Sequence, residues 1–116
     1  MSRTREKIIP FVKWGDYKSD NEKKPDILDL MVVDSELFET EYSTNVHVKK
    51  KQGSKWTDVI LPIKSHESKN ASLLNLWTRN RDRGRLKLKT RIKLKTWLGK
   101  SKTTGRPIRR FALVFS

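Results

Sequence analysis

The stretch RGRLKLKTRIKLKTWLG, residues 83–99, alternates between basic and apolar side chains at nearly every step. From residue 85 its odd positions are cationic and end on Trp97, whereas its even positions are leucine, isoleucine or threonine. Successive side chains of a β-strand point to opposite faces, whereas a helix would scatter these cations around its circumference. The stretch therefore predicts a long, half-buried strand with one apolar and one cationic face. Because strands usually have roughly 3–10 residues, we expect a bend or a bulge between Lys89 and Ile92.

The charge of the chain is concentrated in its second half. The 116 residues carry a net charge of +14. Residues 1–60 hold 11 basic and 11 acidic side chains, whereas residues 61–116 hold 16 basic side chains against Glu67 and Asp82. This one-sided charge points to a polyanionic partner, most often a phosphate backbone, because the self-repulsion needs an offset. A solubilising surface with lysines on a sheet edge is the alternative, but solubility does not require a one-sided distribution.

The composition predicts a single folded domain. A chain of 116 residues has room for one modest core, and its ten aromatic residues argue against disorder. The absence of cysteine excludes disulfides and thiolate metal sites and fits a reducing compartment. No apolar run approaches the roughly 18 residues of a membrane span, and MSRTREKIIP lacks the apolar core of a signal peptide. We therefore expect no membrane partner and a cytoplasmic location, associated with the nucleoid if the source is a prokaryote.

The first third of the chain predicts an arm, a loop and a buried strand. An extended segment over residues 6–14 contains a proline, which suits an edge, and the polar residues 15–26 form a loop. The apolar run over residues 27–33 is typical of a short buried strand. We therefore take residues 1–25 as an N-terminal arm and loop, and residues 26–116 as the folded domain.

Two alternating segments predict a hairpin. One begins at Glu41, the other is WTDVILPI over residues 56–63, and a glycine-containing turn joins them. His47 and Trp56 then share the face that points away from the core. The side chains expected to face the core are Tyr42, Thr44, Val46 and Val48 on the first strand and Thr57, Val59, Leu61 and Ile63 on the second.

The period of the apolar residues changes in SKNASLLNLWTRNRDRG, residues 68–84. Three leucines and a tryptophan recur there at helical spacing, which predicts a helix. Ser68 or Asn70 can cap its start, and Gly84 can end it. After the alternating stretch, a second glycine-containing turn leads to the closing strand over residues 108–115.

The order strand, strand, strand, helix, strand, strand and the ending WLGKSKTTGRPIRRF resemble the OB-fold. The resemblance covers residues 26–116 and rests on the order of elements, because this fold has no diagnostic motif. Among OB-fold proteins the chain looks most like the small archaeal and phage proteins that bind single-stranded nucleic acid. The resemblance implies a mainly β, five-stranded Greek-key barrel with one helix between strands 3 and 4, preceded here by an extended arm. A five-stranded SH3-like barrel and an α+β sheet are the alternatives.

Proteins that bind single strands combine a cationic groove for the phosphates with aromatic faces for the bases. The alternating stretch supplies cations on one face, and its closing tryptophan keeps their parity, so we place that ring on the binding face. The resemblance adds the loop between the last two strands to the binding surface. The arginines at the end of the helix are more numerous than the helix dipole requires, so we count them among the candidates for phosphate binding. The candidate nucleic-acid-binding residues are Lys87, Lys89, Arg91, Lys93, Lys95, Trp97, Trp56, His47, Lys100, Lys102, Arg106, Arg109, Arg79, Arg81 and Arg83.

The other aromatic residues have structural interpretations. Trp77 lies on the apolar stripe of the predicted helix, so we expect it in the core. Phe111 and Phe115 are expected core partners for the same reason, because a small barrel must be filled with large side chains. Trp14 and Tyr17 either stack on a base or attach the arm to the barrel.

The sequence offers little for catalysis. Its two histidines are far apart and lack metal-ligand spacing, and no glycine-rich loop could cradle a phosphate. Asp26, Asp29 and Asp34 could in principle hold Mg²⁺, but acids that flank an apolar strand are the simpler interpretation. Because no nucleophile is paired with a base, we expect no enzyme, no cofactor, no metal and no small-molecule substrate.

The sequence therefore predicts a protein that binds single-stranded nucleic acid, DNA in preference to RNA, with little sequence preference. One alternative is a structural component of a ribonucleoprotein, as in small basic ribosomal proteins. The neutral, well-patterned first half of the chain argues against it. The other alternative is an interaction module whose cationic face docks an acidic protein.

Overall fold

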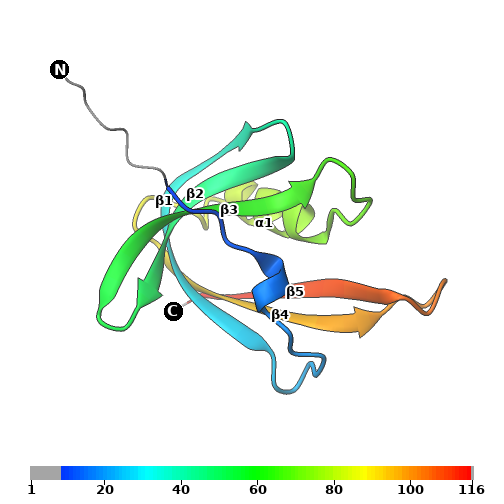
Figure 1. Cartoon of the computed structure of the whole chain (residues 1–116). Helices are drawn as coiled ribbons and strands as arrows, with labels where there is room; N and C mark the ends of the chain where they lie inside the picture. The colour runs from blue at the N-terminus through cyan, green and yellow to red at the C-terminus, as the bar shows by residue number, and fades with distance from the viewer. Residues whose placement is uncertain (1–8, 116) are drawn as a thin grey trace.

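The computed structural model describes residues 9–115, which form one five-stranded antiparallel sheet, one α-helix and a short 3-10 helix (Figure 1). The mainly β class and the single helix between the third and fourth strands confirm the prediction. Residues 6–8 of the predicted extended segment lie outside the described residues. The elements are η1 (Trp14–Asp16), β1 (Asp26–Glu39), β2 (Ser43–Gln52), β3 (Lys55–Ser65), α1 (Ser72–Asp82), β4 (Arg91–Lys100) and β5 (Pro107–Phe115).

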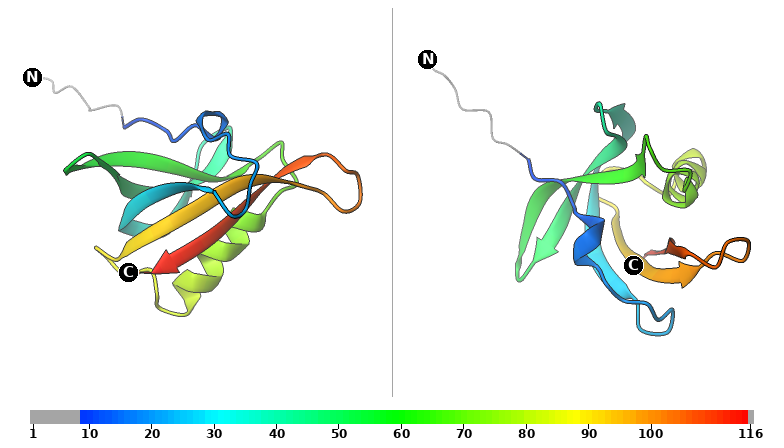
Figure 2. Two further views of the ribbon diagram at one scale, coloured as in Figure 1. Left: turned by 90° about the horizontal axis from the view of Figure 1, so that it is seen from below. Right: turned by 45° about the vertical axis from the view of Figure 1, so that its right-hand side comes forward.

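The strands lie in the order β3-β2-β1-β4-β5, and all neighbours are antiparallel. The strand predicted over residues 27–33 is the long central β1, which pairs with β4 through its first half and with β2 farther along. The sheet curves strongly, and α1 covers one side of it (Figure 2). Its two edge strands, β3 and β5, do not pair with each other, so the sheet is not closed.

The core fills the inner, concave side of the sheet. Alternate side chains of β1, β2, β3 and β4 point inward and pack against Leu73 and Trp77 of α1. This alternation is what the period of a half-buried strand requires. The strand residues that are almost fully buried are Leu28, Leu30, Val32, Asn45, Val46, Val48, Val59, Leu61, Ile63, Ile92, Leu94 and Thr96.

The alternating stretch is a strand only in its second part. From Arg91 to Trp97 the even positions are buried and the odd positions are exposed or half-buried, which confirms the predicted parity there. The prediction of a strand over residues 83–90 is wrong, because this segment forms turns. Leu86 still reaches the core, but Leu88 is 67% exposed.

The break in the stretch has a backbone cause at Lys89, within the region where we expected a bend. Lys89 has φ 66°, and a left-handed residue cannot continue a strand. Its N–H donates to the carbonyl of Val32, 2.8 Å away, and the N–H of Val32 donates to the carbonyl of Thr90, 2.9 Å away. The chain therefore turns beside β1 before β4 begins.

The two leucines of this stretch should respond differently to truncation. Leu94→Ala is expected to destabilise the fold by about 2–5 kcal/mol, because Leu94 is fully buried. Leu88→Ala should change the free energy of unfolding by less than about 0.5 kcal/mol, because its side chain lies in water. Urea unfolding of both variants tests this, and an equal loss of stability would contradict the exposed turn.

The predicted hairpin is present as β2 and β3. Its two-residue turn, Gly53 and Ser54, joins strands whose last pair is Gln52 with Lys55. The inward set is confirmed at Val46, Val48, Val59, Leu61 and Ile63. The expected parity is wrong at the start of β2, where the register shifts between Thr44 and Asn45: Ser43 and Asn45 are buried and Thr44 is half-buried. Tyr42 precedes β2 and is 74% exposed, and Thr57 lies beyond the core near the turn and is exposed.

Helix α1 ends where the sequence predicts, but its N-cap is Ala71, without a side-chain capping hydrogen bond, and not Ser68 or Asn70. The side-chain oxygen of Asn70 accepts a hydrogen bond from the N–H of Ser72, 3.1 Å away, at the first turn. At the other end Gly84 has φ 72°, a conformation that favours glycine. Its N–H donates to the carbonyl of Arg81, and the next N–H donates to the carbonyl of Asn80, which is the Schellman arrangement.

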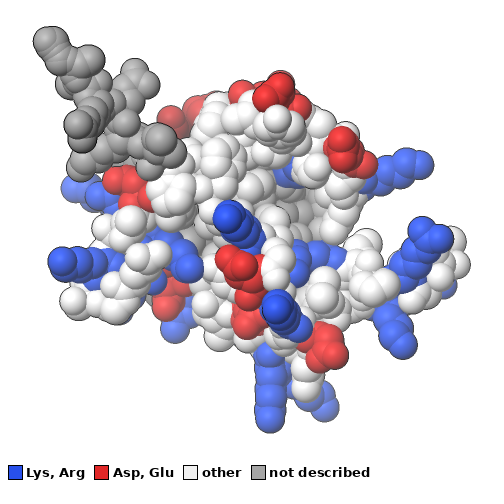
Figure 3. Space-filling model, in the orientation of Figure 1, with Lys and Arg blue, Asp and Glu red and all other residues white. Residues whose placement is uncertain are grey.

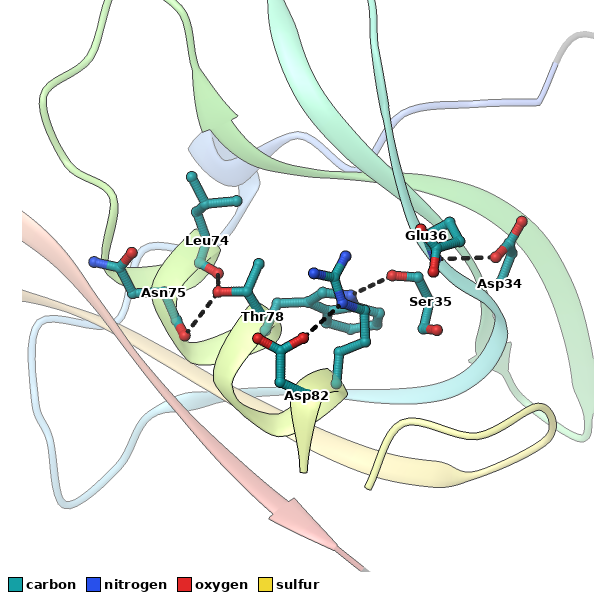
Figure 4. Close-up of polar contacts among 9 residues, drawn as sticks. Asp34, Ser35, Glu36, Leu74, Asn75, Thr78 and Asp82 are labelled. Atoms are coloured by element: carbon teal, nitrogen blue, oxygen red, sulfur yellow. Dashed lines mark hydrogen bonds and ion pairs between the residues drawn. The ribbon is translucent and has the colours of Figure 1, made fainter. Parts of the chain in front are cut away.

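Trp77 attaches the helix to the central strand at Ser35. Figure 4 shows Ser35 facing the helix that carries Leu74 and Thr78. Its side chain is fully buried, which confirms the predicted core position. Its indole N–H donates to the carbonyl of Ser35, 3.1 Å away, so the polar edge of the ring is satisfied. On the same helix the hydroxyl of Thr78 donates back to the carbonyl of Leu74, 2.9 Å away.

The N-terminal arm runs along the β3 edge of the sheet. The N–H of Val12 donates to the carbonyl of Ile60, and the N–H of Ile60 donates to the carbonyl of Pro10, both at 2.8 Å. Val12 is buried in the core, and Ile60, on the outward parity of β3, is buried as well. Residues 10–12 therefore pair with β3 and contribute to the core.

Aromatic side chains of the arm fill the gap between β3 and β5. The Trp14 indole N–H donates to the carbonyl of Pro62, 2.9 Å away, and its ring meets Phe111 edge-on, with centroids 5.1 Å apart. The ring of Tyr17 packs beside that of Trp14, with centroids 5.9 Å apart. Of the two roles considered for Trp14 and Tyr17, the structure shows attachment of the arm.

Phe115, predicted in the core, is 36% exposed because it ends an edge strand.

Candidate nucleic-acid interface

The alternating cations of β4 lie on the convex side of the sheet, opposite the core, which we call the outer face. The strand register brings them beside side chains of the neighbouring strands. Lys93 lies opposite Asp29 of β1, and Arg91 lies opposite Met31, which in turn lies opposite Lys49 of β2. The outer face comprises Trp56 and Asp58 of β3, His47, Lys49 and Lys51 of β2, Ile27, Asp29 and Met31 of β1, and Arg91, Lys93, Lys95 and Trp97 of β4.

A recess of about 260 Å³ surrounds Trp56 at one end of the outer face. Trp56 pairs with Lys51 across the hairpin, and the guanidinium of Arg91 lies 5.7 Å from the centroid of its ring. A half-buried ring beside several cations can stack on a base while the cations hold phosphates. The residues that line this recess are Asp29, Lys51, Trp56, Arg91, Ile92 and Lys93.

A second recess, of about 220 Å³, lies beside Trp97 toward the other end of β4. Trp97 is half-buried on the outer face, so its predicted parity is confirmed. It pairs with Arg110 of β5, and both line the recess, which extends along β5 to the start of α1. Its other lining residues are Glu22, Ser72, Ile108, Arg109 and Phe111. A Cβ at Gly99 would lie 2.8 Å from Nε of Arg110, so only glycine lets that guanidinium lie across β4.

Two acids interrupt the positive charge of the outer face. Asp58 lies 3.0 Å from Nε2 of His47, so this histidine already has an anionic partner. Asp29 faces Lys93 across the strand pair, without an ion pair between them. Within residues 9–115, the ammonium groups of the lysines on this face form no ion pair, and they are available to an external anion. These lysines are Lys49, Lys51, Lys93 and Lys95.

Acidic side chains gather at a different place, near the end of the β1–β2 hairpin (Figure 3). They are Asp34, Glu36, Glu39 and Glu41, and no lysine or arginine occurs between residues 34 and 48. Cations are prominent over the tip of the β2–β3 hairpin and over the β4–β5 loop in the same view (Figure 3). The β1–β2 end of the molecule is therefore acidic, and a polyanion is repelled from it.

The β4–β5 loop carries three of the predicted residues at its ends and tip. Lys100, Lys102 and Arg106 are exposed there. The N–H of Ser101 donates to the carbonyl of Arg106, 2.8 Å away, which closes the base of the loop. The loop therefore presents its cations from a hydrogen-bonded frame next to the Trp97 end of the outer face.

Arg109 lines the Trp97 recess, but its guanidinium is engaged inside the protein, which argues against its predicted role in binding. Its guanidinium points inward from β5 and donates to the carbonyls of Trp14 and Tyr17, 2.9 and 2.7 Å away. It also donates to the hydroxyl of the buried Thr96, 3.1 Å away. Burial lowers the pKa of Arg109 from its ordinary value, and the Asp26 carboxylate opposes that shift. Arg109 therefore fastens the arm to the sheet, and we do not retain it as a binding residue.

The helix arginines also lie apart from the outer face. Arg79, Arg81 and Arg83 belong to α1 and its C-cap, and α1 packs against the core side of the sheet. Arg81 forms an ion pair with Asp82 at 3.3 Å. The prediction that these residues join the β4 cations in one site is wrong, because the helix and the cations lie on opposite sides of the sheet.

Two lysines of the site were missed by the sequence reasoning. Lys49 and Lys51 continue the outward parity of His47 on β2, and Lys51 lines the Trp56 recess. The signal was present in the alternation of this strand. It was overlooked because the run of three lysines resembles a solvated turn.

The acidic residues considered for a metal site serve local structure. Asp26 accepts a hydrogen bond from the N–H of Ser19, and Asp34 accepts one from the N–H of Glu36, both at 2.9 Å. Among residues 9–115, no group of three or more histidine, aspartate or glutamate side chains is placed to hold a metal ion. No helix in this part of the chain is long and apolar enough to cross a bilayer.

Comparison with known proteins adds no assignment. The chain matches no protein-family model, and neither a curated protein nor a solved structure is significantly similar to it.

Proposed function

We propose that this protein binds single-stranded nucleic acid on its outer face, DNA in preference to RNA, and with little sequence preference. One observation carries the proposal: Trp56 and Trp97 are half-buried near opposite ends of one sheet face, and lysines without internal partners lie between them. Stacking on an indole tolerates every base, and contacts to phosphates carry no sequence information. This combination accounts for binding without sequence preference.

The spacing of the two rings supports a strand lying along β4. Trp97 follows Lys93, which lines the Trp56 recess, by four positions, or about 13 Å of strand. That distance corresponds to about four stacked nucleotides, which is the lower limit for one OB-fold. In this arrangement Lys93 and Lys95 hold phosphates while bases turn into the two recesses. The β4–β5 loop extends the path beyond Trp97.

The strand order favours the Greek-key, OB-like interpretation of the fold. Strands β1, β2 and β3 are consecutive antiparallel neighbours, and β4 returns through α1 to lie beside β1. A fourth strand beside the first is the order that defines a Greek key. We propose an OB-like barrel that is left open between β3 and β5, where Trp14 and Arg109 hold the arm in the gap.

The test is a titration with matched oligonucleotides of about 20 nucleotides, followed by tryptophan fluorescence. We expect single strands to quench the emission and to bind more tightly than duplex. If four to six phosphates are held, log K against log salt should have a slope of roughly −3 to −4, at about −0.7 for each contact. Trp56→Phe and Trp97→Phe should each remove part of the quenching.

Other outcomes of this titration would overturn the proposal. A slope near zero would exclude a phosphate-binding face. Binding to folded RNA but not to single strands would favour a structural ribonucleoprotein component. Binding to an acidic protein but to no oligonucleotide would favour a protein-docking module.

A further inference from the structure

The turn over residues 87–90 presents an apolar side chain between two cations. The N–H of its last residue donates to the carbonyl of its first, 3.0 Å away. Lys89, at its third position, has φ 66°, and a positive φ there is typical of a type II turn. Leu88, at the second position, is 67% exposed, although Leu86 two residues earlier is buried.

Backbone hydrogen bonds hold this tip in place. Val32 of the central strand accepts from the N–H of Lys89 and donates to the carbonyl of Thr90. Lys89 is also the only residue other than glycine with a positive φ within residues 9–115. Glycine or asparagine is favoured at such a position, so the backbone alone gives no reason for a lysine there.

Its place in the chain connects the turn to the candidate interface. β4 begins at Arg91, two residues after Lys89, and the Arg91 guanidinium lies over Trp56. A bound nucleic-acid strand that leaves the Trp56 recess past Arg91, toward the start of β4, would meet the turn next. Lys87, Leu88 and Lys89 are all exposed to solvent.

We propose that Leu88 packs against a base of the bound strand as a wedge, while Lys87 and Lys89 hold the phosphates on either side. The inference rests on the proposed function and adds a base contact that is not aromatic. Apolar wedges flanked by cations are a known means of unstacking bases. An exposed leucine among lysines also suits an anionic membrane surface. The continuity with the Trp56 recess favours nucleic acid.

The experiment compares two labelled strands of equal length by fluorescence anisotropy, using the full chain. One strand carries bases, and the other is an abasic deoxyribose-phosphate chain. Leu88→Ala should weaken binding to the first by about fivefold, because a half-exposed apolar contact with a base is lost. It should leave binding to the abasic strand unchanged. Lys89→Gly suits the turn but removes a cation, so it should weaken binding to both strands by the same factor.

Tyr42→Ala is the matched control, because Tyr42 is 74% exposed at the acidic end of the molecule. This substitution should change neither the affinity for the base-containing strand nor that for the abasic strand. Unchanged binding of Leu88→Ala to the base-containing strand would overturn the wedge and leave the proposed function standing. If the wild type binds neither strand, both proposals fail. Phosphatidylserine vesicles provide a further arm, and binding to them that depends on Leu88, with unchanged oligonucleotide binding, would assign the turn to membranes.

Discussion

Trp77→Ala is expected to destabilise the protein by about 3–5 kcal/mol, the usual result of truncating a fully buried tryptophan. The loss has two sources. The cavity removes packing between α1 and the sheet, and the carbonyl of Ser35 loses its 3.1 Å hydrogen bond inside the protein. A domain of this size has a total stability of about 5–15 kcal/mol, so the variant should lose a large share of it and unfold at lower urea concentration. Urea unfolding followed by circular dichroism measures the change.

Trp56→Ala is the control for this prediction, because it removes the same side chain from the outer face. Trp56 is half-buried, and its identified ring contact is the cation–π interaction with Arg91. Its truncation should cost about 1 kcal/mol. A similar loss of stability in both variants would show that Trp56 belongs to the core, and the Trp56 recess would then lose its role as a base-stacking site.

Charge reversal on the outer face should produce the largest loss of affinity. Lys51 and Lys93 line the Trp56 recess from different strands, and neither forms an ion pair within residues 9–115. Replacing both with glutamate removes two phosphate contacts and places two carboxylates beside the bound strand. We expect single-strand affinity to fall by about a hundredfold at low salt. The slope of log K against log salt should become less steep by about 1.4.

The matched control replaces Lys13 and Lys69 with glutamate. Lys13 is exposed on the arm, and Lys69 is exposed in the β3–α1 connection. Both double variants change the net charge by the same amount, so a difference between them reports the location of the charge. We expect the control to lose only a few-fold in affinity, through weaker long-range attraction. Equal losses would mean that total charge, and not the outer face, governs binding. Melting temperatures should show that both variants remain folded.

Local pattern predicted most of the secondary structure. The parity of β4 from Arg91 to Trp97 follows from the two-residue period, and α1 follows from its apolar spacing and from Gly84. These features depend on residues close together in sequence. The predicted strand over residues 83–90 failed because leucine–lysine alternation contains no turn signal, and the turn depends on pairing with Val32, more than fifty positions away.

The candidate site was predicted only in part. The sequence placed Trp56, Arg91 and Lys93 on outward faces, but the register of the sheet was needed to bring them into one recess. Parity alone could not show whether an outward position remains open to solvent. Ile60 has outward parity on β3 and is nevertheless buried, because the arm pairs with it.

The sequence by itself determined which strand residues share a face, because side-chain alternation and the burial of apolar groups operate within each extended segment. The tertiary structure alone decided which cations stay available. Arg109 and Lys93 are both basic residues on alternating strands, yet Arg109 binds carbonyls more than ninety residues away, whereas Lys93 forms no ion pair in the described chain. The physical reason is competition. Arg109, on the concave side, meets buried carbonyls that need a partner, whereas the Lys93 side chain, on the convex side, is exposed to water.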